Sequence, residues 1–470
     1  MTNAIVRIES IEVKNFKNVG YGYLDFENTK KEYKSSILGL YGQNGSGKTA
    51  LIDALELLRL ALSGRSVPEY FADYINVESD HATVKYGLSV RNPDENSIFT
   101  VFYEVSIRRD TDDLGENTGR SDGGTIRKTM LFGEVLSYAC DGTENKVRLS
   151  VLFDTRPADT AFIPKAKYNE IIGKSRETAT NLLVAKRLAG TTSRSFIFSK
   201  EFMNELRGNC KERRYLCLME GLVNFGNYEL FVITTRNAGL INMDALPIAF
   251  GCSEEKKVSA GSVLVKLDEP SVIPEEALSA VHKVVDNMNV VLRQLVPGLT
   301  IGVKDLGTQL LSDARPGSRI QLVSNKNSRE IPLKYESDGI KKLISVLQLL
   351  IVIYNKPSIT VAVDELDAGI FEYLLGEILR IISEKGRGQL IFTSHNLRPL
   401  ETLDKGFIAF TTTNPMNRYI RLNNVKTTNN LRDFYYRDIV LGEQSESVYE
   451  PTNNSEISLA FREAGMRDGR

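Results

Sequence analysis

The chain is poor in the residues that build several common kinds of site. Its 470 residues include no tryptophan, three histidines and four cysteines, too scattered to make a zinc pattern. The cysteines have no paired spacing, so we expect free thiols in a reducing, cytoplasmic compartment: Cys140, Cys210, Cys217 and Cys252. A formal net charge of −1 gives no global reason to expect binding to a polyanion.

Long apolar runs are also missing. No segment approaches the roughly 18 apolar residues of a membrane span, and the N-terminus has no signal-like apolar core, so we expect neither secretion nor a membrane. Sustained heptads are absent, which excludes a long coiled-coil arm. With 42% hydrophobic residues, the chain can form two to three domains around at least one large core.

The most informative motif that is present is a glycine-rich octapeptide. It fits the pattern Gly-x-x-x-x-Gly-Lys-Thr at every fixed position, with Gly42, Gln43, Asn44, Gly45, Ser46, Gly47, Lys48 and Thr49. A short apolar strand at 36–41 precedes it, and leucines at helical spacing follow it until Gly64. A plain strand-to-helix turn is the alternative, which the full match and its flanks disfavour.

The residue types of this loop suit a nucleoside triphosphate. Glycines let backbone N–H groups converge on phosphate oxygens, and the N-terminus of the following helix adds a positive dipole. Lys48 would reach the β- and γ-phosphates, and the Thr49 hydroxyl would bind Mg²⁺. The motif therefore predicts a bound triphosphate with Mg²⁺.

A second motif is an acidic pair behind an apolar run. Residues 359–363 are β-branched and apolar, as in a buried parallel strand, and Asp364 and Glu365 follow them. We expect Asp364 to hold the Mg²⁺ shell and Glu365 to polarise the attacking water. The alternative is a strand end that meets solvent.

A third motif, Ser337-x-Gly339, opens an apolar helix one helix upstream of the acidic strand. Alone it would be an ordinary helix cap, but its position resembles the signature motif of ABC-type ATPases. In that family, the serine and helix N-terminus of one protomer grip the γ-phosphate of ATP held by another. The resemblance therefore implies that Ser337 and Gly339 bind ATP across a dimer.

Further residues extend this resemblance. His395 ends the strand 389–393 and resembles the switch histidine of the family, whereas His81 and His282 are expected on the surface. Asp367 occupies the D-loop position, as a cross-dimer contact, with Phe371 where many relatives carry histidine. No convincing Q-loop glutamine is found between the first helix and residue 84.

The order of the motifs predicts the fold. Lys48 and Ser337 are 289 residues apart, so we expect an α/β ABC-type P-loop ATPase head with a mixed sheet, split by an inserted, mainly helical domain. The expected parts are the N-terminal part of the head at 1–110, an inserted strand and helical region at 111–300, the C-terminal part of the head at 301–440 and a flexible tail at 441–470.

Composition along the chain adds detail. We expect strands at 83–90 and 97–107, an exposed loop at 110–127, helices at 164–222 and 274–295, and strands at 406–411 and 418–422. The second helical range carries an apolar stripe along one face, which predicts packing in a core, with a short coiled-coil arm as the alternative. A basic cluster is either a solvated helix face or a contact for nucleic acid or an acidic partner: Arg207, Lys211, Arg213 and Arg214.

Residues 1–110 and 300–440 together resemble the standalone ABC-like ATPases of bacterial anti-phage defence, which are related to OLD, SMC and RecF proteins. The resemblance is closest to AriA of PARIS systems, followed by PtuA of Septu systems. It implies ATP with Mg²⁺, slow regulatory hydrolysis, a homo-oligomer, a separate Toprim or HNH effector nuclease and a phage-derived trigger. About 75 residues follow His395, too few for a Toprim domain of the chain's own.

Two other functions remain open. A DNA repair or maintenance ATPase of RecF or SMC type would be stimulated by duplex DNA, whereas a subunit of an ABC transporter would have a shorter head and a clear Q-loop. In the mechanism that the resemblance implies, Lys48 and Thr49 bind MgATP in one protomer, and Ser337 and Gly339 of another close over it. Glu365 with His395 then hydrolyses the ATP.

Overall fold

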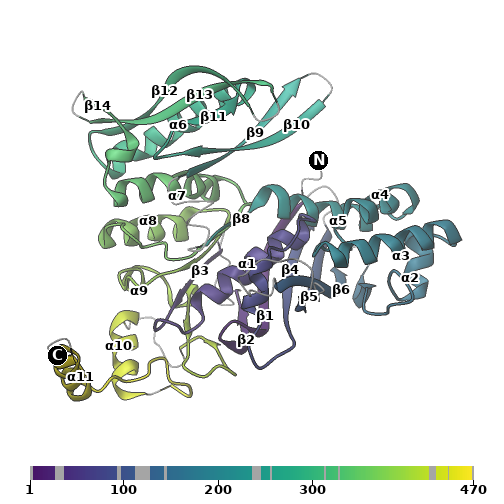
Figure 1. Cartoon of the computed structure of the whole chain (residues 1–470), viewed down its shortest axis with the longest axis horizontal. Coiled ribbons are helices and arrows are strands. Elements are labelled where there is room, and N and C mark those ends of the chain that lie inside the picture. The colour runs from purple at the N-terminus through teal and green to yellow at the C-terminus, as the bar shows by residue number, and fades with distance from the viewer. Residues whose placement is uncertain are drawn as a thin grey trace.

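The computed structural model describes most of the chain (Figure 1). The described residues are 4–26, 36–92, 97–111, 127–141, 146–234, 245–254, 257–311, 314–326, 329–422, 430–442 and 444–467. Within these ranges, the strands form four sheets, two of six strands, one of four and one of two. No described helix combines the length and the apolar run that crossing a membrane requires.

The first sheet is antiparallel throughout, in the order β2-β1-β4-β5-β6-β7. Its strands are β1 (Ile5–Phe16), β2 (Val19–Asp25), β4 (His81–Asn92), β5 (Ser97–Thr111), β6 (Arg127–Asp141) and β7 (Val147–Asp154). Alternate residues of β1 are buried, as in a sheet with one face on the core. That face packs on helix α1 (Lys48–Leu62), where the Tyr86 hydroxyl donates to the Ala54 carbonyl at 2.5 Å.

The second sheet has the order β18-β17-β3-β16-β15-β8 and is parallel except for β18. Its strands are β3 (Ser36–Tyr41), β8 (Leu230–Ile233), β15 (Thr360–Val363), β16 (Gln389–Thr393), β17 (Ile408–Thr411) and β18 (Tyr419–Ile420). Every residue of β15 and β16 is buried, as expected of parallel strands covered on both faces. The predicted ABC-type α/β head with a mixed sheet is confirmed.

Two layers cover this parallel sheet. Ala362 of β15 belongs to the core shared with α1 and the first sheet, whereas Val361 and Val363 belong to the core shared with α7 (Asp338–Asn355) and α8 (Glu372–Lys385). The carboxyl ends of β3, β15 and β16 lie at one edge because these strands run parallel. Three of the predicted motifs follow these strand ends, so the topology gathers them.

A third unit lies beyond α7 (Figure 1). It contains β9 (Ala245–Glu254), β10 (Lys257–Lys266), β11 (Ser271–Pro274), β12 (Leu299–Leu310), β13 (Pro316–Lys326), β14 (Arg329–Pro332) and helix α6 (Glu275–Leu295). The predicted helix at 274–295 is therefore confirmed. Its buried line passes through Val285 and Leu292, while Val284 and Val291 are partly buried, because a 3.6-residue period drifts around a long helix. Asn289 bonds both backbone groups of Ile301 at 2.8 Å and ties α6 to β12.

The region between the two halves of the head was expected to be a single inserted, mainly helical domain, and the structure differs from this. Helices do fill 164–222, as predicted: α2 (Lys165–Ile171), α3 (Arg176–Thr191), α4 (Lys200–Asn209) and α5 (Arg213–Asn224). However, β6 and β7 extend the first sheet, and β8 joins the second. The expected division at residue 110 falls inside β5, and residues 112–126 of the expected loop lie outside the described residues.

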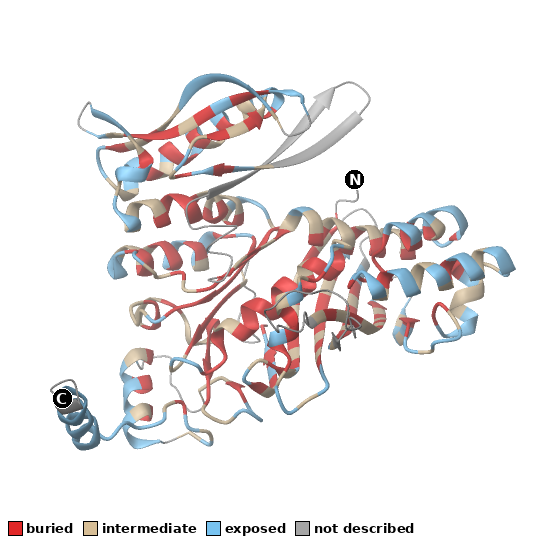
Figure 2. Cartoon of the chain, viewed as in Figure 1, coloured by how far each residue is buried: buried red, intermediate tan, exposed pale blue. Residues whose placement is uncertain are grey.

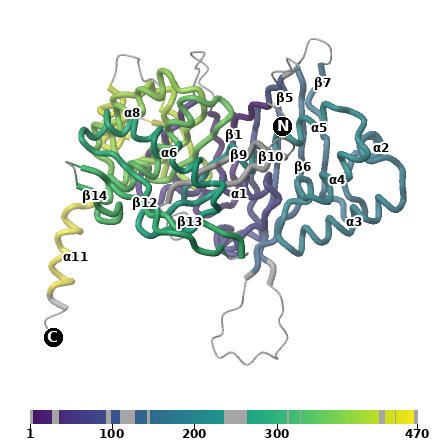
Figure 3. The backbone as a smooth tube through the Cα atoms, turned by 90° about the horizontal axis from the view of Figure 1, so that it is seen from above, coloured from purple at the N-terminus to yellow at the C-terminus, as the bar shows by residue number. Residues whose placement is uncertain are grey.

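The C-terminal segment also differs from the expected flexible tail. After α10 (Leu431–Leu441), residues 454–467 form helix α11, whose first turn is capped by the Asn453 side chain accepting from the Ser455 backbone at 3.0 Å. The described side chains of α11 are exposed, and the helix projects from the body (Figures 2 and 3). The strand expected at 406–411 begins only at Ile408, since residues 405–407 form a 3₁₀ turn, and β18 is a two-residue strand.

Candidate nucleotide-binding site

The glycine-rich loop connects β3 to α1, as its motif predicts. Three of its glycines have positive φ, with values of 152° at Gly42, 75° at Gly45 and 95° at Gly47. A Cβ atom on Gly42 would lie 1.8 Å from Thr411 Oγ1. The loop therefore needs glycine both for its backbone conformation and for its contact with β17.

Lys48 lies in the first turn of α1 and is only 7% exposed. Its Nζ donates to the carbonyl oxygens of Gly42 at 2.8 Å and Gln43 at 3.0 Å, so the ammonium group folds over its own loop. Burial lowers the pKa of Lys48, while the nearby carboxylates, led by Asp364, act in the opposite direction. A phosphate held in the loop would give this buried cation an anionic partner.

Two hydroxyl groups fasten the loop to the sheet. Ser46 Oγ donates to the Gln43 carbonyl at 2.6 Å and shares a hydrogen bond with Thr411 Oγ1. Thr411 in turn donates to the Tyr41 carbonyl at 3.2 Å. Sequence reasoning missed Thr411, because it lies more than 350 residues from the loop and belongs to no motif.

The acidic pair stands at the end of β15, as predicted. Asp364 is 2% exposed, and its Oδ1 accepts from Thr393 Oγ1 of the neighbouring strand at 2.6 Å. The same Thr393 oxygen accepts from the Glu365 backbone at 2.7 Å. Glu365 has a φ of 49°, in the left-handed region that glutamate rarely adopts. Such strain concentrates at functional sites, where the surrounding structure holds one residue in place.

One cleft of about 590 Å³ brings these motifs together. The residues that line it are Lys17, Asn18, Asn44, Gly45, Gly47, Lys48, Thr49, Ala50, Asp364, Glu365 and His395. Gly42 and Ser46 support the loop from behind and do not line the cleft. Hydroxyl and carboxylate oxygens from Thr49 and Asp364 are ligands that suit Mg²⁺, so the donor set fits the expected metal.

His395 reaches this cleft from an exposed loop. Its backbone N–H donates to Asp367 Oδ2 at 3.0 Å, and that of Asn396 donates to the same oxygen at 2.9 Å. Asp367 was expected to contact a second protomer, but here it holds the switch loop of its own chain. His81 and His282 are both exposed, as expected.

The signature residues lie outside the cleft of their own chain. Ser337 is exposed and caps α7, accepting from the Ile340 backbone at 3.4 Å. Gly339 packs against the loop that follows the acidic pair, where an added Cβ would lie 2.2 Å from the Gly369 carbonyl oxygen. Within one chain, Ser337 therefore acts as a helix cap, and its exposed position leaves it accessible to a second molecule.

A second, larger cleft of about 850 Å³ adjoins the first and shares Lys17, Asn18 and Thr49 with it. Its other wall is the loop Asp73–Glu78, in the region where no Q-loop glutamine was found. Arg109 donates to the Ile75 carbonyl at 2.5 Å and so fixes this loop. Sequence reasoning missed this wall, because its residues belong to no motif.

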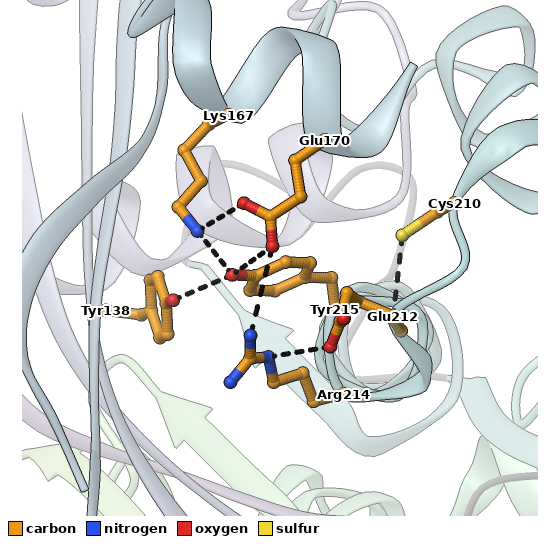
Figure 4. A network of polar contacts seen from close by, with 7 residues as sticks. All are labelled: Tyr138, Lys167, Glu170, Cys210, Glu212, Arg214 and Tyr215. Carbon is orange, nitrogen blue, oxygen red and sulfur yellow. Dashed lines mark hydrogen bonds and ion pairs between the residues drawn. The ribbon is translucent and has the colours of Figure 1, made fainter. Parts of the chain in front are cut away.

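Two side chains of the predicted basic cluster form ion pairs within the chain, and Figure 4 draws one of them, Arg214. Arg207 pairs with Glu220 at 3.0 Å, and Arg214 pairs with Glu212 at 3.3 Å. Beside them, Tyr215 Oη accepts from Lys167 Nζ at 2.6 Å. The choice between a solvated helix face and a contact for nucleic acid or an acidic partner stays a prediction.

Comparisons with known proteins agree with the site's general class. Residues 10–158, less than half of the chain, match a family model described as an AAA domain. A search of curated protein sequences finds no match. Together, the family match and the phosphate loop identify an ATPase-type domain.

Solved structures of ATPase heads are similar at a low level. A Smc head domain from Pyrococcus furiosus, bound to the C-terminal domain of ScpA, has a TM-score of 0.40 and 13% identity, covering 89% of this chain and 96% of that one. The SMC head from Thermotoga maritima gives 0.36 and 15%, with 89% and 99% covered. The recombination mediator RecF gives 0.37 and 11%, with 89% and 98% covered. Similarity this weak carries no information about function.

Proposed function

We propose that the chain binds and hydrolyses ATP in a site that a second copy completes, and that this switch controls a separate effector nuclease in anti-phage defence. The observation that carries the ATP part is the split between two half-sites. One cleft is lined by the phosphate loop, by the expected Mg²⁺ ligands and by the acid Glu365. Ser337, in contrast, is exposed at the N-terminus of α7. A helix N-terminus of this kind binds anions, and the γ-phosphate of another protomer's ATP is a suitable one.

Each residue of the cleft has a role in this proposal. Backbone N–H groups around Gly45 and Gly47 and the Lys48 ammonium bind the phosphates. Thr49 and Asp364 hold Mg²⁺, which would neutralise charge on the phosphates. Glu365, fixed by its backbone bond to Thr393, orients the attacking water.

The neighbouring cleft suits the nucleoside part of ATP. It is continuous with the phosphate cleft through Thr49 and offers both apolar and polar surface, as nucleoside sites do. Lys17 pairs with Asp53 and lies 4.0 Å above the Tyr74 ring, so this wall is held in place before ligand arrives. Preformed walls lower the entropy cost of binding.

Exposed aromatic side chains near the signature motif support association with a second copy. Tyr335 is 68% exposed just before Ser337, and Phe371 and Tyr373 are 72% and 54% exposed after Gly369. Gly339 touches Gly369, so the two backbone segments that carry these side chains meet at one junction. Exposed aromatic residues are enriched where proteins bind each other.

The proposed ATP switch is tested by measuring whether the mass of the assembly in solution depends on nucleotide. We expect Glu365→Gln protein to gain mass on adding ATP and Mg²⁺, because hydrolysis no longer separates the protomers, as measured by native mass spectrometry. In the matched control, Glu365→Gln with Ser337→Arg still binds ATP but gains no mass. ATP-dependent association that survives Ser337→Arg would contradict the shared site.

The defence role rests on the resemblance of the motifs, and its test is separate. Co-expression with the adjacent gene is expected to give a stable complex with a Toprim or HNH nuclease, whose toxicity depends on phage. The alternative is a RecF- or SMC-type ATPase in DNA repair or maintenance. ATPase activity that duplex DNA stimulates without a partner would favour that alternative.

A further inference from the structure

A buried lysine, Lys342, lies on the helix that begins with the signature motif, near carboxylates of the candidate site. Lys342 is one turn beyond Gly339 on α7 and is only 3% exposed. Burying an ammonium group costs free energy unless opposite charges are near, so the groups around Lys342 show what compensates its charge. Three carboxylates act on it and counter the lowering of its pKa by burial: Asp367, Glu365 and Asp364, in decreasing order.

Asp367, the first of these neighbours, is bonded on one side only. Its Oδ2 accepts the backbone N–H groups of His395 and Asn396 at 3.0 and 2.9 Å. Its Oδ1 is buried and has no hydrogen-bond partner among the described residues. A buried carboxylate oxygen without such a partner is costly, which points to a bond made in another state of the protein.

Contact between backbones joins the same two elements. Gly339 of α7 lies so close to the loop after the acidic pair that a Cβ atom would be 2.2 Å from the Gly369 carbonyl oxygen. A displacement of the α7 N-terminus therefore acts directly on the loop that carries Asp367. Because attraction between buried charges is weakly screened, a shift of Lys342 changes the pull on Asp367.

We propose that Lys342 and Asp367 form a positioning pair that transmits engagement of the signature serine to the switch-histidine loop of the same chain. When the γ-phosphate of a partner's ATP draws Ser337 inward, α7 carries Lys342 toward Asp367 Oδ1, while Asp367 Oδ2 holds His395 in place for the chain's own ATP. This inference rests on the shared site proposed above. It makes hydrolysis in each of the two sites depend on ATP in the other.

The test compares turnover with association. We expect Lys342→Met to lower kcat about tenfold and to bring the Hill coefficient for ATP down to 1, while ATP affinity and the mass gain in the Glu365→Gln background persist. Lys342→Arg keeps the positive charge, so it should restore most of the wild-type kcat and most of the cooperativity. The matched control is Lys186→Met on α3. Lys186 is half-buried, donates to the Pro157 and Thr160 carbonyls, lies far from the cleft in the sequence and is absent from its walls.

A second variant covers the case in which Lys342→Met fails to fold. Asp367→Asn keeps an oxygen for the His395 and Asn396 N–H groups and removes only the charge, so we expect the same loss of kcat and cooperativity. Unchanged kcat and cooperativity in a folded variant would overturn the coupling. If the Glu365→Gln protein itself gains no mass with ATP, the shared site fails instead, so the two failures are distinguishable.

Discussion

Two polar clusters of the molecule have similar residues and opposite character. In the cluster between α2, α5 and β6, Lys167 bonds Glu170 at 2.7 Å and Tyr215 at 2.6 Å, and Tyr215 bonds Tyr138 at 3.0 Å (Figure 4). In the nucleotide cleft, Glu365 is held in a strained backbone conformation and a buried oxygen of Asp367 lacks a hydrogen bond.

The two clusters differ in how their charged side chains are bonded within the chain. In the first cluster the charged side chains pair with one another, although the Nε of Arg214 is buried without a hydrogen bond, and burial together with Tyr215 raises the pKa of Tyr138 to about 12, so its hydroxyl stays protonated. The second keeps a buried cation, Lys48, bonded only to backbone carbonyls of its own loop in the described structure. We infer that the first cluster supports stability and the second supports function, which substitutions can test.

Lys48→Ala should have the largest effect. It removes the buried cation that faces the phosphates, so we expect ATP affinity to fall by about 100-fold or more, equivalent to about 3 kcal/mol of binding free energy. Isothermal titration with ATP and Mg²⁺ measures this change. Lys186→Met is the control that retains binding, and tight ATP binding by Lys48→Ala would refute the assignment of the loop.

Glu365→Gln should separate binding from chemistry. The amide keeps the shape of the side chain but cannot accept a proton from water, so we expect turnover to fall by about 100-fold while the Kd for ATP changes little. Phosphate release and equilibrium binding are measured on the same preparation. Undiminished ATPase activity would remove Glu365 from the catalytic role.

Tyr215→Phe should affect stability alone. It removes the hydroxyl that bonds Lys167 and Tyr138, and losing a partner in a buried network costs about 1–3 kcal/mol of unfolding free energy. Chemical denaturation measures the loss, with Tyr228→Phe as an exposed control that changes little. A large change in the ATPase rate would show that this cluster is more than structural.

Glu229→Gln should have the smallest effect, visible only as pH dependence. Burial raises the pKa of Glu229 from 4.5 to about 7. The folded state therefore favours the protonated carboxyl, so wild-type stability decreases as pH rises from about 4.5 to about 7. We expect the melting temperature of the wild type, relative to the variant, to fall across that range, and a flat difference would contradict the shift.

Contiguous motifs made most of the site predictable. The octapeptide around Lys48 and the apolar run before Asp364 each carry their geometry in local sequence, since one fixes a loop and the other fixes a buried strand. The mainly apolar composition of β3, β15 and β16 is typical of parallel strands covered on both faces, whereas their order in the sheet comes from the structure. These local signals gave the head fold and the cleft.

Contacts between distant segments were not predictable in the same way. The inward orientation of Asp367, the burial of Lys342 and the loop Asp73–Glu78 depend on how layers pack, and no periodicity records this. The same limit applies to β6 and β7, which read as parts of an insert although they extend the first sheet. Helix α11 was missed because its apolar residues face no core that would make the pattern regular.

The place of β3 in its sheet has a consequence for how the protein is made. Both sheet neighbours of β3, the strands β16 and β17, come from residues 389–411. At usual rates of synthesis, the ribosome needs roughly 20 to 70 s to translate the chain from β3 to β16 and β17. A nascent chain thus carries its phosphate loop without the neighbouring strands until residues 389–411 have been synthesised.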